Sequence, residues 1–147
     1  MPYADALFGA LERRDAIRPI DDGALSIDDA YAISLDLLSR RRARGERVVG
    51  KKIGVTSKAV QSMLGVHQPD FGFLTDRMWI EGETIHIAAA GLIQPRAEAE
   101  IAFILRDSLR GPGITAEQVI AATDSIAPCF EIVDSRIADW KITFADT

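Results

Sequence analysis

The chain has 147 residues, of which 48% are hydrophobic and 27% charged, a balance that suits one compact domain or part of a larger fold and excludes a disordered tail. The formal net charge of -5 argues against a polyanionic partner, so we expect no nucleic-acid binding. The single cysteine, Cys129, excludes a disulfide framework, and no stretch approaches the roughly 20 apolar residues of a membrane span. We therefore expect a cytoplasmic protein that does not bind membranes.

Helical patterns fill the first part of the chain. Apolar residues at helical spacing predict a helix over residues 3–16. A second helix is expected to begin after Ser26, which forms a capping box with Asp29, and to close at Gly45. The basic run "RRRAR" at 40–44 falls at the end of this helix, where cations favour the negative end of the helix dipole. A solvated helix end is therefore favoured over a phosphate-binding patch.

A short strand and a third helix are predicted next. The segment "RVVGKKIGVTS" indicates a strand that ends in a turn, and Ser57 is expected to cap a short helix that Gly65 stops. The following segment "VHQPDFGFLTDRMWI", residues 66–80, is rich in turn residues and is predicted to be a loop.

From residue 79 the pattern becomes that of β-structure. Strands are predicted at "TIHIAAA" (84–90), at 97–105 and at "SIAPCFEIVDS" (125–135), and Thr115 is expected to cap a helix between the last two. We therefore predict an N-terminal α/β domain at 1–78 and a second, β-rich domain at 79–147.

Two acids share one face of the strand in "QPRAEAEIAFIL". Because side chains alternate along a strand, Glu98 and Glu100 lie on the same face, on the order of 7 Å apart along the backbone. Glu131 interrupts an apolar run in the later strand, where an isolated carboxylate is costly. If the two strands are neighbours, the three acids meet, and oxygen donors alone favour Mg²⁺, Mn²⁺ or Ca²⁺ over zinc. The alternative is that Glu98 and Glu100 form the solvent face of an edge strand.

Other reactive side chains are less informative. The segment "GKKIGVTSK" lacks the spacing of a phosphate-binding loop, so we do not expect nucleotide binding. A lysine there could bind a carboxylate or transfer a proton, or it could simply be exposed. Cys129, next to Pro128 in an apolar run, is expected to be a small buried residue rather than a nucleophile.

Three ordered segments, "VVGKKIGVTSKAVQSMLGVHQPDFGFLTDRM", "PRAEAEIAFIL" and "PCFEIVDSRIADWK", carry a family resemblance. They resemble the 2-hydroxypenta-2,4-dienoate (2-keto-4-pentenoate) hydratases and 4-oxalocrotonate decarboxylases of the fumarylacetoacetate hydrolase superfamily. The resemblance implies an α+β chain with a small N-terminal α/β domain, followed by the first part of a fumarylacetoacetate-hydrolase-like mixed β-roll. It also implies Mg²⁺ or Mn²⁺ held by Glu98, Glu100 and Glu131, a catalytic Lys52 and a substrate-binding Asp76.

The implied activity is a metal-dependent hydratase of aromatic meta-cleavage degradation. It would add water to 2-hydroxypenta-2,4-dienoate to give 4-hydroxy-2-oxopentanoate, and we expect a homo-oligomer. The same motifs leave 4-oxalocrotonate decarboxylase open. Family members are considerably longer, so we expect the N-terminal portion of such an enzyme, and a catalytically inert binding or assembly module is the third hypothesis.

Overall fold

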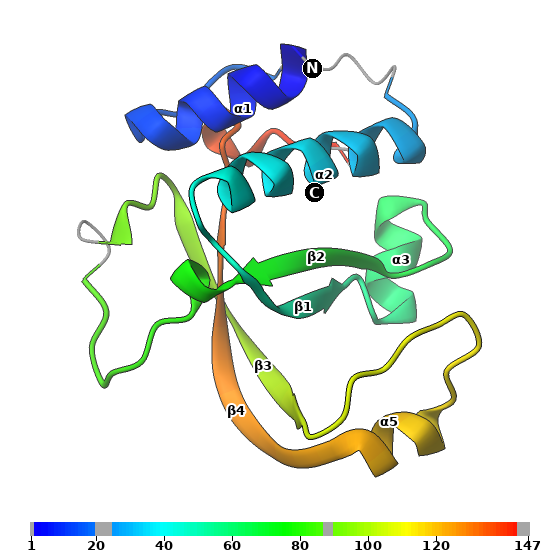
Figure 1. Ribbon diagram of the computed structural model, residues 1–147. Coiled ribbons are helices and arrows are strands. Elements are labelled where there is room, and N and C mark those ends of the chain that lie inside the picture. Colours follow the sequence, from blue (N-terminus) through cyan, green and yellow to red (C-terminus); the bar gives the residue numbers. More distant parts are fainter. Residues whose placement is uncertain (1, 20–24, 87–89, 144–147) are drawn as a thin grey trace. The chain divides into compact units, whose positions relative to one another are not determined.

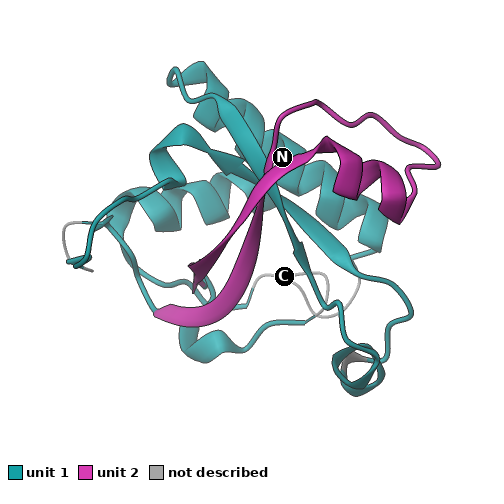
Figure 2. Cartoon of the chain, turned by 90° about the horizontal axis from the view of Figure 1, so that it is seen from below, with its two compact units in different colours: residues 1–94, 135–147 teal, residues 95–134 magenta. Residues whose placement is uncertain are grey.

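The computed structural model describes residues 2–19, 25–86 and 90–143. The chain forms two compact units, Met1–Gln94 with Ser135–Thr147, and Pro95–Asp134 (Figure 2). This division by packing differs from the boundary near residue 78 expected from composition, which stays a prediction.

Two helices open the first unit (Figure 1). α1 spans Pro2–Arg13 and α2 spans Ile27–Ala43. The predicted capping box is confirmed, because the Ser26 hydroxyl accepts from the Asp29 backbone N–H while the Asp29 carboxylate accepts from the Ser26 N–H. Gly45 follows the helix end with a positive φ of 86°, a conformation that glycine adopts without steric cost. The start and the end of α2 therefore both follow from its local sequence.

A two-stranded sheet follows the helices. β1 (Val48–Gly54) pairs antiparallel with β2 (Asp70–Thr75), and α3 (Lys58–Leu64) connects them. Ser57 caps α3 and Gly65 ends it at a φ of 68°, as predicted. The short 3-10 helix η1 (Asp76–Met78) continues from β2.

The predicted loop at 66–80 is wrong, because β2 lies within it. The Phe71 ring stacks on Tyr31 of α2 with ring centroids 4.9 Å apart, and Phe73 meets Phe71 edge to face at 5.8 Å. These aromatic side chains are typical of strands. Pairing with β1 and packing against α2 outweigh the turn propensity of Pro69, Asp70 and Gly72, which the sequence pattern had emphasised.

The segment that begins at Ser135 belongs to the first unit. Its η2 helix spans Ala138–Trp140, and Ile137, only 2% exposed, pairs with Ile17 in an isolated parallel bridge. The Gln94 amide donates to the carbonyls of Ser135 and Ile137 at 3.0 and 2.9 Å. These two hydrogen bonds link Gln94, where the chain leaves the first unit, to the segment at which it re-enters that unit.

The second unit consists of β3 (Pro95–Leu105), α5 (Ala116–Ala122) and β4 (Thr123–Asp134). β3 and β4 pair antiparallel along nearly their whole length. Thr115 caps α5 in a capping box with Gln118, as predicted. The predicted strand at 84–90 differs: residues 84–86 are not in a strand, and residues 87–89 lie outside the described residues.

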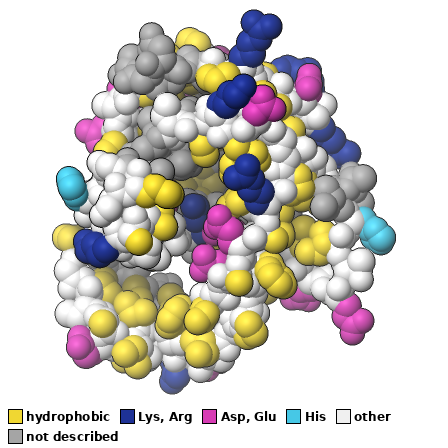
Figure 3. All heavy atoms as spheres, turned by 180° about the vertical axis from the view of Figure 1, so that it is seen from behind, with side chains coloured by type: hydrophobic (Ala, Val, Ile, Leu, Met, Phe, Trp, Pro, Cys, Tyr) yellow, Lys and Arg dark blue, Asp and Glu magenta, His cyan; other side chains and the backbone are white. Residues whose placement is uncertain are grey.

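One face of the β3–β4 sheet is apolar and exposed. Hydrophobic side chains gather at the surface in the lower part of Figure 3, where α5 and the neighbouring strand ends lie. The exposed large side chains on this face are Ile101, Phe103, Ile126 and Phe130. Cys129 is exposed on the opposite face, so the expectation of a buried cysteine is wrong. A two-stranded sheet covers neither of its faces, and for this reason apolar residues of β4 remain accessible.

Candidate metal centre

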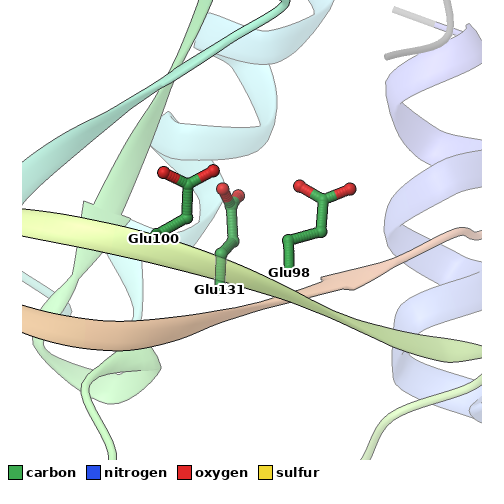
Figure 4. Close-up of side chains that lie close together, drawn as sticks. All are labelled: Glu98, Glu100 and Glu131. Atoms are coloured by element: carbon green, nitrogen blue, oxygen red, sulfur yellow. The ribbon is translucent and has the colours of Figure 1, made fainter.

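Three carboxylates converge on one face of the β3–β4 sheet. The register places Glu98 of β3 directly opposite Glu131 of β4, and Glu100 follows two positions along β3 on the same face. One carboxylate oxygen from each residue lies within 4.8 Å of the others. Figure 4 shows the three side chains pointing to the same side of the sheet. The two strands are therefore neighbours, which is the condition that the sequence left open.

The donor set fits a hard divalent cation. Glu98 and Glu100 are exposed and Glu131 is half-buried, so the three side chains have room to reach a common point. Two oxygens on one Ca²⁺ lie at most about 5 Å apart, and on one Mg²⁺ at most about 4.2 Å apart. Ligand oxygens within 4.8 Å of one another are close enough for small rotations of the glutamate side chains to bring them onto one such cation. Without a cation, three like charges at this spacing repel one another.

Lys52 lies on β1 in the first unit. Its ammonium Nζ is 3.6 Å from Oδ1 of Asp70 on β2. The Lys52 side chain is 28% exposed and that of Asp70 11%, so the pair is shielded but accessible to a small molecule. Lys52, the predicted catalytic residue, is thus paired with the Asp70 carboxylate and is not a freely exposed lysine.

Asp70 is the residue that the sequence reasoning missed. It was assigned to a loop, where its distance from Lys52 could not be inferred. The detectable signal was the alternation in "DFGFLT": once this segment is paired with β1, Asp70 falls opposite Gly54 and two positions from Lys52 on the same face. Assigning this segment to a strand paired with β1 would therefore have predicted that Lys52 and Asp70 lie close together.

Asp76 has a local partner in this structure. Its carboxylate accepts a hydrogen bond from the Arg47 backbone N–H at 3.0 Å and another from the Arg47 guanidinium at 3.2 Å. These bonds, chiefly the one from the backbone, lower the pKa of Asp76 below its ordinary value. Substrate binding by Asp76 stays a prediction, and the observed geometry gives it a role in closing the junction between the α2–β1 connection and η1.

The basic run at the end of α2 is used in ion pairs within the first unit. Arg40 pairs with Asp5 and Asp36, Arg41 with Glu46, and Arg44 with Glu12. The Arg44 guanidinium also lies over the Phe8 ring at 4.5 Å from its centroid. These contacts tie α1 to α2 and give Arg40, Arg41 and Arg44 carboxylate partners within the chain.

The described helices are all too short or too polar to cross a bilayer. Lys52, Asp70 and Asp76 belong to one unit and the three glutamates to the other. The first unit thus carries a lysine–aspartate pair and the second unit carries a carboxylate triad.

Two curated proteins that are similar to this chain are named hydratases. The chain is 60% identical over 144 residues to a 2-hydroxyhexa-2,4-dienoate hydratase of Comamonas testosteroni, and 59% identical over 146 residues to a 2-hydroxypent-2,4-dienoate hydratase of Pseudomonas putida. These alignments cover 96% and 97% of this chain, but 54% and 65% of the relatives. The chain thus spans roughly half to two thirds of the curated relatives' length. No family model matches it.

Solved structures give the same picture of the fold. The 4-oxalocrotonate decarboxylase from Pseudomonas putida G7, complexed with magnesium and adipate, superposes with a TM-score of 0.87 at 33% sequence identity. The match covers 97% of this chain and 55% of that one. The same decarboxylase complexed with calcium and acetate gives a TM-score of 0.81. The predicted α+β fold, part of a fumarylacetoacetate-hydrolase-like architecture, is confirmed.

Proposed function

Because the chain belongs to the family of 2-hydroxypentadienoate hydratases and 4-oxalocrotonate decarboxylases, we propose that it carries the metal-binding part of a hydratase. The reaction is the addition of water to 2-hydroxypenta-2,4-dienoate to give 4-hydroxy-2-oxopentanoate, in the degradation of aromatic compounds by meta-cleavage. The observation that carries the proposal is the convergence of Glu98, Glu100 and Glu131 in a chain so similar to named hydratases.

The three glutamates would hold Mg²⁺ or Mn²⁺. When bound, such a cation supplies a Lewis acid that stabilises negative charge on the substrate's C2 oxygen during ketonisation. The triad supplies oxygen donors only, which suits hard cations, and all three come from paired strands, which fixes their spacing. Magnesium in the related decarboxylase structure supports this choice.

Lys52 would act on the organic part of the substrate. Its ammonium can pair with a substrate carboxylate or deliver a proton to the far end of the diene, C5, as the enol proton leaves the C2 oxygen. Water then adds its oxygen to C4 and a proton to C3, which completes the atom balance of hydration. Asp70 holds the ammonium in place for either role.

The assay of this proposal is spectrophotometric. The chain with Mg²⁺ should remove the ultraviolet absorbance of the dienoate and form 4-hydroxy-2-oxopentanoate, identified by mass spectrometry. A chelator should stop the reaction, and renewed Mg²⁺ should restore it. Absence of turnover with Mg²⁺ and Mn²⁺, or turnover indifferent to chelation, contradicts the proposal.

The decarboxylase is the second candidate, favoured by the TM-score of 0.87 to 4-oxalocrotonate decarboxylase. The same triad could stabilise the enolate left when CO₂ departs. Release of CO₂ from 4-oxalocrotonate, with no hydration of the dienoate, would select it. The lower sequence identity to this structure, 33% against 60% to the hydratase, makes it the weaker candidate.

We further propose that the protein is cytoplasmic and forms a homo-oligomer. The exposed apolar face of β3 and β4 supports association, because large apolar patches on soluble proteins mark interaction sites. Light scattering coupled to gel filtration measures it directly: a homo-oligomer is expected, and a strict monomer over the accessible concentration range contradicts it.

A further inference from the structure

Lys52 lies on a face of the β1–β2 sheet where three of its neighbouring positions are glycines. Gly50 and Gly54 flank it at two positions on either side along β1, and Gly72 is its direct partner on β2. Alternation along strands and pairing across them place all three glycines on the Lys52 face. Every one of these nearest positions therefore lacks a side chain.

Backbone conformation does not explain these glycines. Gly65, at the end of α3, has a positive φ of 68°, but Gly50, Gly54 and Gly72 are outside the left-handed region. Glycine inside a strand is less favourable than alanine, since it loses more freedom on folding and packs no side chain. A reason for the glycines must therefore be sought in the space around them.

That space is occupied by Lys52 and Asp70 at two of the three positions. A Cβ on Gly72 would lie 3.2 Å from Lys52 Cγ and 3.3 Å from Lys52 Cε, tighter than ordinary contacts. A Cβ on Gly54 would lie 2.9 Å from Lys52 Nζ and would overlap Asp70 Oδ1. Asp70 is mostly buried, so its carboxylate has little room to rotate away.

Gly50 differs from the other two. A Cβ there would meet only Leu74, at 3.7 and 3.9 Å, which is ordinary van der Waals contact. The three glycines are thus graded by crowding, with Gly54 the most crowded, Gly72 intermediate and Gly50 open. The chain itself offers a matched control for any alanine substitution on this face.

We propose that Gly54 and Gly72 are positioning residues, which keep the sheet face clear so that the Lys52 side chain lies along it with its ammonium at Asp70. The positioning is a property of the first unit, while its purpose, presenting Lys52 to a substrate, rests on the proposed function. Alanine at either position pushes the lysine outward without removing a charge.

The test measures lysine reactivity in the intact chain. Wild type and the variants Gly54→Ala, Gly72→Ala and Gly50→Ala are treated with an amine-acetylating reagent, and fragment-ion mass spectrometry follows Lys52 and Lys51 in the same peptide. Lys51 is the internal reference, because it lies on the opposite face, with its ammonium 5.7 and 5.6 Å from the ring centroids of Phe71 and Phe73.

The expected ratio of Lys52 to Lys51 acetylation rises about two- to fivefold in Gly54→Ala, the range for weakening a partly exposed ion pair. It rises less in Gly72→Ala and not at all in Gly50→Ala. Asp70→Asn, which removes the partner charge, should match Gly54→Ala. Circular dichroism verifies folding, and either crowded variant can carry the test if the other fails to fold. Ratios in both crowded variants equal to that of Gly50→Ala overturn the proposal.

A second readout separates this proposal from the proposed function. If the chain hydrates the dienoate, kcat should fall in Gly54→Ala and stay at the wild-type level in Gly50→Ala. If the chain has no hydratase activity, the proposed function fails, but the acetylation ratios still decide whether Gly54 and Gly72 position Lys52.

Discussion

Glu98 and Glu131 face each other directly across the antiparallel pairing of β3 and β4. Cross-strand partners on one face lie close enough for their side chains to interact, and like charges placed so are destabilising. The carboxylates of this pair and of Glu100 therefore repel one another when no cation is bound. Such an arrangement is readily explained when a cation lies between the carboxylates.

Removing one charge from the triad should stabilise the metal-free chain. Glu100→Gln relieves repulsion within the triad at an exposed member and should raise the melting temperature by about 3 °C in the presence of a chelator. Glu83→Gln makes the same chemical change at an exposed residue outside the triad and should leave the melting temperature nearly unchanged. Equal effects of the two substitutions would mean that the triad carries no special repulsion.

The hydrogen bonds to Asp76 should make stability depend on pH. Its pKa is lowered on folding, mainly by the Arg47 backbone N–H, so its contribution is present above the ordinary aspartate pKa of about 3.9 and is lost as the pH falls through the lower folded value. Thermal melts of wild type and Asp76→Asn should therefore differ at neutral pH and converge in acid. Arg47→Gln keeps the backbone donor, so it should retain most of this pH dependence. A constant difference between wild type and Asp76→Asn at all pH values contradicts the assignment.

The cap of α2 should contribute measurably to stability. Ser26→Ala removes the hydroxyl that accepts from the Asp29 N–H and should lower the free energy of unfolding by about 1 kcal/mol. Ser39→Ala, at an exposed position inside the same helix, should be neutral or slightly stabilising, because alanine is the better helix former. Urea denaturation measures both, and equal effects would show that the cap is dispensable.

A buried polar contact fixes the end of β2. Thr75 is fully buried and its hydroxyl donates to the carboxylate of Glu46, which also pairs with Arg41 at 3.2 Å. Thr75→Val should lower the free energy of unfolding by about 1–3 kcal/mol, because a buried carboxylate oxygen loses its donor. Thr56→Val, at an exposed site, is the control. A neutral Thr75→Val would show that Arg41 alone satisfies Glu46.

Local signals in the sequence predicted much of the fold. The caps at Ser26, Ser57 and Thr115 were predicted at the residues where the structure has them, because a cap depends on residues only three positions apart. The strands containing Glu98 and Glu131 were also predicted, because alternation and apolar runs mark them. Whether they are neighbours was open until the structure showed their pairing.

Features that depend on distant partners were not predictable in the same way. β2 is a strand because β1 and Tyr31 lie against it, and its own residues include several that favour turns. The pairing of Lys52 with Asp70 depends on the register between these strands, which no single segment encodes. Cys129 was expected to be buried because its neighbours are apolar, but its exposure depends on what covers the sheet. Each error has the same cause, namely that tertiary context overrides local propensity.

If β3 and β4 assemble one divalent-cation site from three glutamates, the chain should bind such a cation in solution. Isothermal titration of Mn²⁺ and Mg²⁺ into the chelator-treated chain measures this binding. We expect one saturable site per chain, with affinity weakened at least about 100-fold in Glu98→Gln, Glu100→Gln and Glu131→Gln, and unchanged in Glu83→Gln. Absence of saturable binding, or binding that survives all three triad substitutions, would contradict this expectation.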